Sequence, residues 1–205
     1  AHISYYHDGN DDQKFTRCTN ADCSAKNTTI IESAGNVGDT NSVKIGADGF
    51  ARIAYLQDDS NDVKFARCTN VDCTAKNITT VDSSGDVGEW LSLALGSNGF
   101  ARISYHDDTD NELQFARCTD ADCTNKNITM IDSTNDVGKH NSIVLDSNNF
   151  ARISYYDASG RDLKFVQCTN EDCTNKNITT VDSSGTVGEY TSIALGADGF
   201  ARISY

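Results

Sequence analysis

The stretch TSIALGADGFARISY, residues 191–205, decides the fold. Ser192–Leu195 alternates small and large side chains, and residues 201–205 do the same, which is typical of short, half-buried strands. The pair Asp198-Gly199 between these runs suits the positive-φ positions of a tight turn. The stretch is therefore predicted to form a β-hairpin.

The same hairpin recurs in residues 42–55, 92–105 and 142–155, always 50 residues after the previous copy. Internal repetition with a period of about 20–50 residues indicates a propeller, a solenoid or an array. We expect one repeat domain over residues 1–205, made of units 1–50, 51–100, 101–150 and 151–200. Residues 201–205 would begin a fifth unit.

Residues 51–100 show what one unit contains. Strands are predicted at residues 51–55, 63–68, 77–81 and 92–95, with polar turns between them and no apolar stripe at helical spacing. Four antiparallel strands in each repeat are typical of a propeller blade, which must stack on its neighbours to bury both faces. The predicted fold class is all-β and β-propeller-like, with a four-bladed ring as one arrangement. An open β-solenoid, or part of a longer repeat array, is the alternative.

Several motifs of the unit resemble tandem repeats of secreted microbial surface proteins. These motifs are ARISYYD at residues 151–157, LKF at residues 163–165 and the C-x4-C pairs. The resemblance implies β-propeller blades and a surface location, and it implies no catalytic residue. The turn at residues 97–99 is also similar to the Asp-box of sialidase-like propellers, although it lacks the closing Trp of that motif.

Eight cysteines form four pairs of identical C-x4-C spacing. The turn-forming residues between them can bring the two Cα atoms of a pair within disulfide range. A zinc site is the alternative, but each pair would need a second pair or a histidine to complete four ligands. We predict disulfides, and hence an oxidising compartment. The predicted pairs are Cys18–Cys23, Cys68–Cys73, Cys118–Cys123 and Cys168–Cys173.

Four N-x-[ST] sequons lie at one place in the unit, four residues after the second cysteine. The middle residue of the sequon varies between Thr28 and Ile78, while the Asn and the Thr do not. In a host with the glycosylation machinery, we expect these sites to carry N-glycans at similar occupancy. The sites are Asn27, Asn77, Asn127 and Asn177.

The acidic loops offer a further candidate ligand set, for calcium. Residues 8–12 and 107–112 are rich in carboxylates, but the matching loop at residues 157–162 contains Ala158 and Arg161. Calcium needs six to eight oxygen ligands in a reproducible arrangement, so solvated loops explain the pattern better. The histidines do not recur in every unit either. We therefore expect neither a metal nor a cofactor.

Catalytic motifs are missing from the sequence: there is no G-x-S-x-G elbow and no phosphate-binding glycine loop. We expect a non-enzyme, with a glycosidase-like propeller as a distant third possibility. The repeat symmetry breaks at Thr40, Trp90, His140 and Tyr190, just before the predicted innermost strand. Diversified side chains on a rigid scaffold suit a binding rim, although drift at a tolerant loop would look the same.

The formal net charge of −13 argues against nucleic acid or an anionic membrane surface as a partner. No run of residues is apolar enough for a membrane span. The preferred function is an extracellular structural or adhesive repeat protein, and the alternative is a carbohydrate- or protein-binding propeller that uses the variable rim. If Ser192–Leu195 closed a ring beside residues 1–5, residues 201–205 would compete for the same place. We therefore expect self-association through terminal strands, as in a fibre or longer array.

Overall fold

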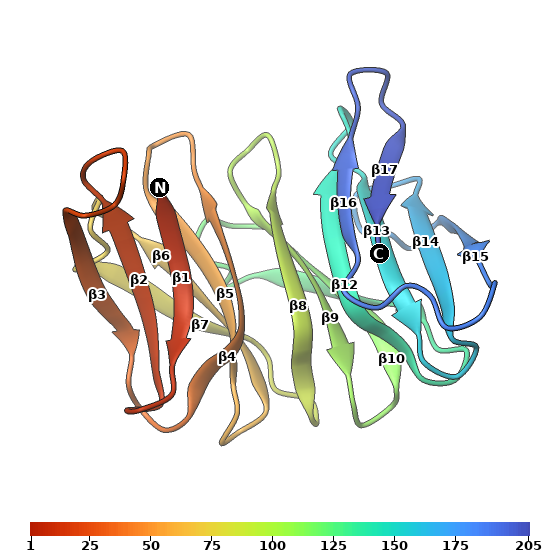
Figure 1. Ribbon diagram of the computed structural model, residues 1–205, viewed down its shortest axis with the longest axis horizontal. Coiled ribbons are helices and arrows are strands. Elements are labelled where there is room, and N and C mark those ends of the chain that lie inside the picture. Colours follow the sequence, from red (N-terminus) through yellow and green to blue (C-terminus); the bar gives the residue numbers. More distant parts are fainter.

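The computed structural model describes all residues from 1 to 205, which form seventeen β-strands and no helix. The strands build a row of antiparallel sheets, which Figure 1 shows side by side from the N-terminal sheet to the C-terminal hairpin. The prediction of an all-β, β-propeller-like fold is confirmed. No helix that is long and apolar enough to cross a membrane is present.

The three central sheets have four strands each, whereas the first sheet has three and the last has two. The first sheet contains β1 (His2–His7), β2 (Asp12–Cys18) and β3 (Lys26–Glu32). The second contains β4 (Val37–Ile45), β5 (Ala51–Gln57), β6 (Asp62–Cys68) and β7 (Lys76–Asp82). The third contains β8 (Val87–Leu95), β9 (Ala101–Asp107), β10 (Glu112–Cys118) and β11 (Lys126–Asp132). The fourth contains β12 (Val137–Leu145), β13 (Ala151–Asp157), β14 (Asp162–Cys168) and β15 (Lys176–Asp182), and the last contains β16 (Ser192–Leu195) and β17 (Ala201–Ser204).

Each four-stranded sheet begins with the last strand of one repeat unit and continues with the first three strands of the next. The hairpins that the sequence predicts join the two units, and Leu93 lies opposite Ile103 in the register of β8 and β9. The turn differs from the expected two-residue form. Gly49 has a φ of 80°, and its N–H donates to the carbonyl of Gly46 over 2.9 Å. Only the second residue of each predicted turn pair is therefore left-handed, as in longer hairpin loops.

The hydrophobic core lies between neighbouring sheets, as stacking of repeat units requires. One cluster combines Phe65 and Val81 of the second sheet with Leu93 and Tyr105 of the third, and all four are at most 2% exposed. The strand pattern that places Phe65 and Tyr105 on inward faces is the period-two alternation visible in the sequence. Apolar burial between sheets is the main stabilising contribution.

The four predicted disulfides are present, with the two Cα atoms of each pair 4.7–4.9 Å apart. No cysteine is free in this structure. The second, third and fourth of the loops closed by a disulfide each present an Asp to the preceding sheet. The carboxylate of Asp122, for example, accepts a hydrogen bond of 2.5 Å from Nε of Arg67. The loop thus joins one sheet to the next.

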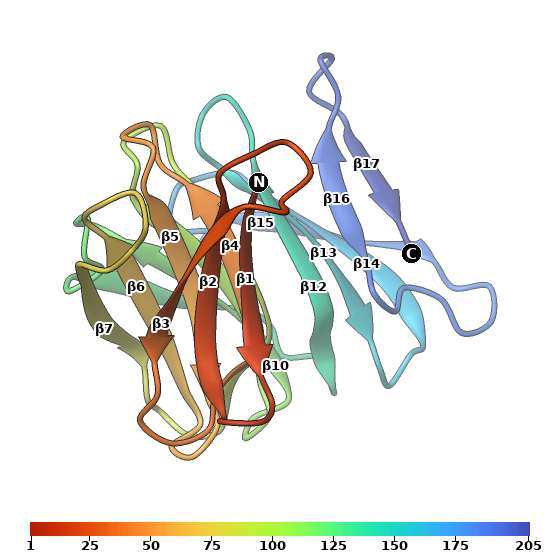
Figure 2. The ribbon, with the colours of Figure 1, turned by 60° about the vertical axis from the view of Figure 1, so that its left-hand side comes forward.

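The expected four-bladed ring does not close. β16 pairs with β17, so that Ile193 lies opposite Ile203, and β1 pairs only with β2. Figure 1 shows β1 and β16 in different sheets, with complete sheets between them. Local hairpin formation closes a far shorter loop than pairing with β1 would, so its entropic cost is lower. In Figure 2 the β16–β17 hairpin extends beyond the turns of the other sheets, and the outer edge of β17 has no partner strand.

Candidate functional site

A bulge interrupts the innermost strand of each complete sheet. In the pairing of β8 with β9, Glu89 lies opposite His106 and Ser92 lies opposite Ser104. Two residues of β8 therefore face one residue of β9, which is the signature of a β-bulge. The variable positions thus lie within β4, β8 and β12, not before the innermost strand as the sequence predicted. Only in the last hairpin does the variable position, Tyr190, precede its strand.

The three aromatic residues at the variable positions adopt a left-handed backbone. The φ angles are 52° for Trp90, 50° for His140 and 55° for Tyr190. Such angles are uncommon for bulky side chains and persist only where the surroundings enforce them, often at functional sites. The fourth position holds Thr40, which does not adopt a positive φ. The left-handed backbone, at a bulge for Trp90 and His140 and just before β16 for Tyr190, is thus shared by three large side chains.

Asn141 holds the bulges of neighbouring sheets together. Its Nδ2 donates to the carbonyl of Trp90 over 2.6 Å and to that of Gly138 over 3.0 Å. Its Oδ1 accepts a hydrogen bond of 2.5 Å from Oγ of Ser104. Asn141 is only 7% exposed, so loss of these bonds would leave buried polar groups unpaired. This side chain fixes the backbone that carries Trp90.

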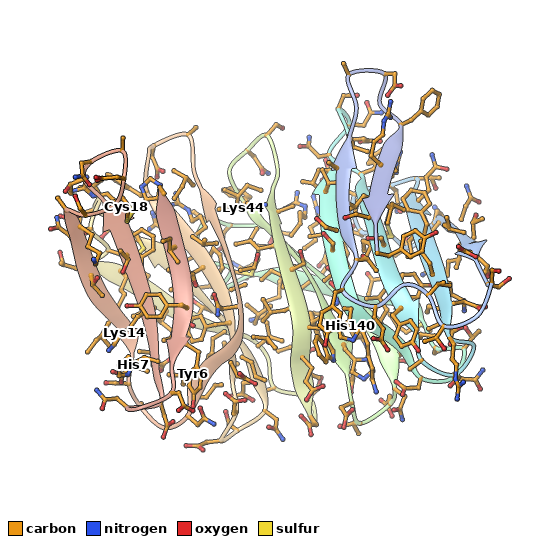
Figure 3. All side chains as sticks on the ribbon, in the orientation of Figure 1. Tyr6, His7, Lys14, Cys18, Lys44 and His140 are labelled. Atoms are coloured by element: carbon orange, nitrogen blue, oxygen red, sulfur yellow. A yellow bond between two sulfur atoms is a disulfide. The ribbon has the colours of Figure 1, made fainter.

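The three aromatic side chains meet in one group, which we call the aromatic cluster. The ring centroids of Trp90 and His140 are 3.8 Å apart, and those of His140 and Tyr190 are 4.2 Å apart. Trp90 and Tyr190 face each other edge to face at 6.3 Å. Figure 3 labels His140 in the lower half of the view, whereas the turn of the β16–β17 hairpin is at the top. The sequence separates these residues by 50 positions each, and the stacking of sheets brings them together.

An open cavity of about 360 Å³ adjoins the aromatic cluster. Its lining comes from the four repeats of the same short segment, so it lies where the innermost strands converge. The structure therefore brings all four candidate rim residues to one cavity. The lining residues are Asp39, Thr40, Asn41, Trp90, Leu91, His140, Asn141, Tyr190 and Thr191.

The cavity lining combines aromatic groups with one carboxylate, that of Asp39, and Asp58 lies outside this lining. Burial lowers the pKa of His140, so its imidazole is neutral at pH 7, although the nearby Glu189 opposes this shift. Burial, and then the negative charge of Asp39, raise the pKa of Asp58 to about 6. Nε1 of Trp90 and Nδ1 of His140 are enclosed without a hydrogen-bond partner. Two polar atoms of the aromatic cluster therefore have no hydrogen-bond partner in this structure.

The sequons are exposed and lie on β3, β7, β11 and β15, the outermost strands. The cavity lies at the opposite edge of the sheets, where the innermost strands are. Their environments are not equivalent. Nδ2 of Asn27, Asn77 and Asn127 donates to Asp72, Asp122 and Asp172 of the following sheet, over 3.0–3.1 Å. Asn177 has no such partner in this structure. The four sequons therefore differ in their contacts although they occupy equivalent positions in the units.

The acidic loop of the third unit brings Asp107, Asp110 and Glu112 close together. Oδ1 of Asp107 accepts two backbone hydrogen bonds from within the loop, at 3.0 and 3.2 Å. These bonds are those of a self-contained polar turn. In the fourth unit Lys164 lies 2.8 Å from the equivalent carboxylate, Asp157. The acidic loops therefore differ in their bonding from unit to unit.

Sequence reasoning missed Asn141 and its partner Ser104, which position the aromatic cluster. Of the four equivalent positions in the units, only 41 and 141 hold an Asn. This difference between units was the one signal in the sequence that could have indicated the role of Asn141. Their function depends on contacts between sheets. Asn41 makes the matching bond with Ser4 over 2.6 Å between the first two sheets.

No known family of sequences matches the chain, and no curated protein matches it either. Two solved structures are similar in fold. A protein of unknown function from Bacteroides caccae shares 11% identity at a TM-score of 0.52, over 86% of this chain and 55% of that protein. A bifunctional GH43-CE protein from Bacteroides eggerthii shares 9% identity at a TM-score of 0.51, over 98% of this chain and 30% of that protein. The chain thus spans about half or less of these structures, and the likeness concerns the β-propeller fold alone.

Proposed function

We propose that this chain is an extracellular adhesive repeat protein that binds carbohydrate at the aromatic cluster, without catalysing a reaction. The observation that carries the proposal is the convergence of Trp90, His140 and Tyr190, each with a left-handed backbone, beside one open cavity. The four disulfides support the location, because they indicate an oxidising environment.

The chemistry of the cavity suits a sugar. Aromatic rings offer flat apolar faces with polar edges, and Tyr190 is 73% exposed. Asp39, Thr40 and Asn41 line the same cavity and supply acceptors and donors for hydroxyl groups. Thr40 is small, so the side of the cavity next to the second sheet stays open. A volume of about 360 Å³ holds a ligand the size of one or two sugar rings.

The test is a glycan array probed with the soluble chain, followed by calorimetric titration of any sugar found. Trp90→Asn and Tyr190→Asn remove a ring while keeping a residue that tolerates a left-handed backbone. Each is expected to weaken binding at least about tenfold, because stacked aromatic residues dominate such contacts. The matched control is Phe200→Asn, which removes a 72% exposed ring at the β16–β17 turn.

Binding that all three variants retain would place the sugar elsewhere. If the folded protein binds no glycan, the aromatic cluster does not have the proposed role. Circular dichroism of each variant checks that the sheets are intact.

Assembly into a fibre is the second candidate function. It is supported by two unpaired edges, on β17 and on β1, which offer free backbone N–H and C=O groups. In the proposed arrangement, β17 of one copy pairs with β1 of the next copy. Such contacts are head-to-tail and do not close, so they build filaments.

Deletion of residues 200–205 tests this assembly by light scattering and electron microscopy. The full chain is expected to form concentration-dependent oligomers, and the shortened chain is expected to remain monomeric. A full chain that stays monomeric at high concentration would rule out the fibre role while leaving sugar binding intact.

A further inference from the structure

His106 is an unusual residue at the contact between the third and fourth sheets. It lies on β9, is 0% exposed, and replaces Tyr6, Leu56 and Tyr156 of the other units. A fully buried imidazole needs a partner for each ring nitrogen, because an unsatisfied polar atom in the interior is costly. Its two nitrogens have different surroundings.

Nδ1 of His106 lies 2.9 Å from the carbonyl oxygen of Val137 on β12. A carbonyl can only accept, so Nδ1 carries the hydrogen and the neutral ring presents a lone pair at Nε2. This Nε2 atom is buried and has no hydrogen-bond partner. A histidine held by a backbone carbonyl at one nitrogen and bare at the other is the usual arrangement of a metal ligand.

Two carboxylates face this lone pair. Oδ1 of Asp108 is 3.5 Å from Nε2 of His106, and Oδ1 of Asp136 is 3.8 Å from it. Oδ1 of Asp136 is itself buried without a hydrogen-bond partner. Each carboxylate oxygen therefore lies near the lone pair of Nε2, and such electron-rich atoms repel unless a cation lies between them.

The distances distinguish a metal ion from a shared proton. A charge-assisted hydrogen bond from a protonated histidine would be about 2.7–2.9 Å long, shorter than either contact. Zinc bonds to nitrogen and oxygen are about 2.0–2.2 Å, which places neighbouring donors of a tetrahedral ion about 3.4 Å apart. The contacts of 3.5 and 3.8 Å between Nε2 and the carboxylate oxygens are close to that separation. The two carboxylates are more than 4.8 Å from each other, so Asp108 must turn to complete the site.

The surroundings hold the carboxylates and admit an ion. Nζ of Lys139 bonds Oδ2 of Asp136 over 2.8 Å, which orients the other oxygen toward His106. The Asp108 side chain is 47% exposed, so it can turn toward an ion that enters from solvent. Glu89 lies opposite His106 in the strand register and adds a further carboxylate beside the site. This local excess of negative charge favours a cation.

We infer that His106, Asp108 and Asp136 bind a divalent transition-metal ion at the contact between the third and fourth sheets. One nitrogen and two oxygen ligands, with water completing the coordination, favour zinc over calcium, which prefers oxygen ligands alone. The ion would join β9 to the segment before β12 and so fix the two sheets together. This metal site and the carbohydrate site share no residue, and either can bind without the other.

The sequence pointed away from this site, because the histidines do not recur from unit to unit. Because the units differ at the three positions of this site, the other units provide natural controls. Asn36 stands where the site has Asp136, and Ala158 stands where it has Asp108. The second unit has both carboxylates, Asp58 and Asp86, and lacks only the histidine, which is Leu56 there.

The test is titration of the chelator-treated protein with zinc, by calorimetry and by elemental analysis after gel filtration. Wild type is expected to bind one zinc ion per chain. His106→Tyr and Asp136→Asn introduce residues found at the same place in other units, so the fold should tolerate them. Each is expected to weaken binding at least about tenfold. Cobalt substitution gives a second readout, since a tetrahedral cobalt spectrum should appear in wild type and vanish in both variants.

Leu56→His provides the gain-of-function arm, because it completes the same three residues between the second and third sheets. It is expected to raise the stoichiometry to two ions per chain. The matched control is Tyr156→His in the fourth unit, which lacks both carboxylates and should leave the stoichiometry at one. Absence of zinc binding by wild type, or binding that His106→Tyr does not weaken, would overturn the inference.

Discussion

The phenol of Tyr105 donates a hydrogen bond of 2.6 Å to Oδ2 of Asp82, which joins β9 to the end of β7 in the preceding sheet. Tyr105 is 0% exposed and Asp82 is 7% exposed. Burial, together with the charge of Asp82, raises the pKa of Tyr105 well above its usual range, so the phenol remains a donor at any physiological pH. The same contact recurs at Tyr55–Glu32, Tyr155–Asp132 and Tyr205–Asp182.

Tyr105→Phe is expected to lower the free energy of unfolding by about 1–3 kcal/mol, because it leaves the buried Asp82 carboxylate without its donor. Urea denaturation followed by tryptophan fluorescence measures the change. Tyr205→Phe is the matched control, since Tyr205 is 55% exposed and water can replace its hydroxyl. It should leave stability unchanged within error. Equal losses in the two variants would show that the contact itself is not what stabilises the sheets.

The disulfides should differ in their resistance to reduction. Cys68 and Cys73 are 0% exposed and pack with Phe15 and Ile31 of the preceding sheet. Cys18 and Cys23 belong to no such core cluster in this structure and are partly exposed. Reduction requires access of an attacking thiolate to a sulfur atom. We therefore expect the Cys18–Cys23 bridge to be reduced first.

Limited treatment of the folded protein with a thiol, followed by alkylation and peptide mapping, measures this order. Without the thiol, no free cysteine should be labelled. The control is the same treatment in denaturant, in which all four bridges should react at similar rates. Simultaneous reduction of the bridges in the folded protein would show that exposure does not control the reaction.

The strands were predictable because their information is local. Alternation in residues such as Ser192–Leu195 specifies a strand and its inward face, and the 50-residue repeat specifies that each hairpin recurs. The disulfides were predictable for the same reason, since each pair spans a single short turn. These features require no knowledge of how one sheet sits on another.

The open arrangement and the functional sites depend on contacts between sheets, which the local pattern does not encode. The left-handed backbone of Trp90 is set by Asn141 from another sheet, 51 residues away. The lone pair of His106 becomes notable only when Asp136 is brought beside it from the next sheet. Whether β16 reaches β1 depends on the rotation between successive sheets, which is a global quantity.

Glycan occupancy should be unequal if the chain is secreted from a host that performs N-glycosylation. Asn77 is held by the Asp122 carboxylate of the following sheet, so a sugar on its Nδ2 would have to displace that contact. Asn177 makes no such contact. Occupancy is therefore expected to be highest at Asn177, as measured by glycopeptide mass spectrometry. Asp122→Ala should raise occupancy at Asn77 alone, and equal occupancy at all four sites would contradict this reasoning.

The stability of the chain should fall with rising pH because of Asp58. Burial, and then the charge of Asp39, raise the pKa of its carboxyl to about 6 in the folded protein, against about 3.9 in an unfolded chain. The folded state therefore holds the proton more tightly, and the associated stability is present below about pH 4 and lost as pH rises through 6. Oδ2 of Asp58 is buried without a hydrogen-bond partner, so the ionised carboxylate of Asp58 is unfavourable in the folded protein.

Asp58→Asn is expected to remove this loss, so that the variant exceeds wild type in melting temperature at pH 7 but not at pH 4. Thermal unfolding measured from pH 4 to pH 8 tests this difference. Asp39→Asn removes the second cause of the shift, so the fall in stability should end at lower pH and be smaller than in wild type. A melting-temperature difference between Asp58→Asn and wild type that is the same at pH 4 and pH 7 would show that the Asn acts through packing and not through the charge.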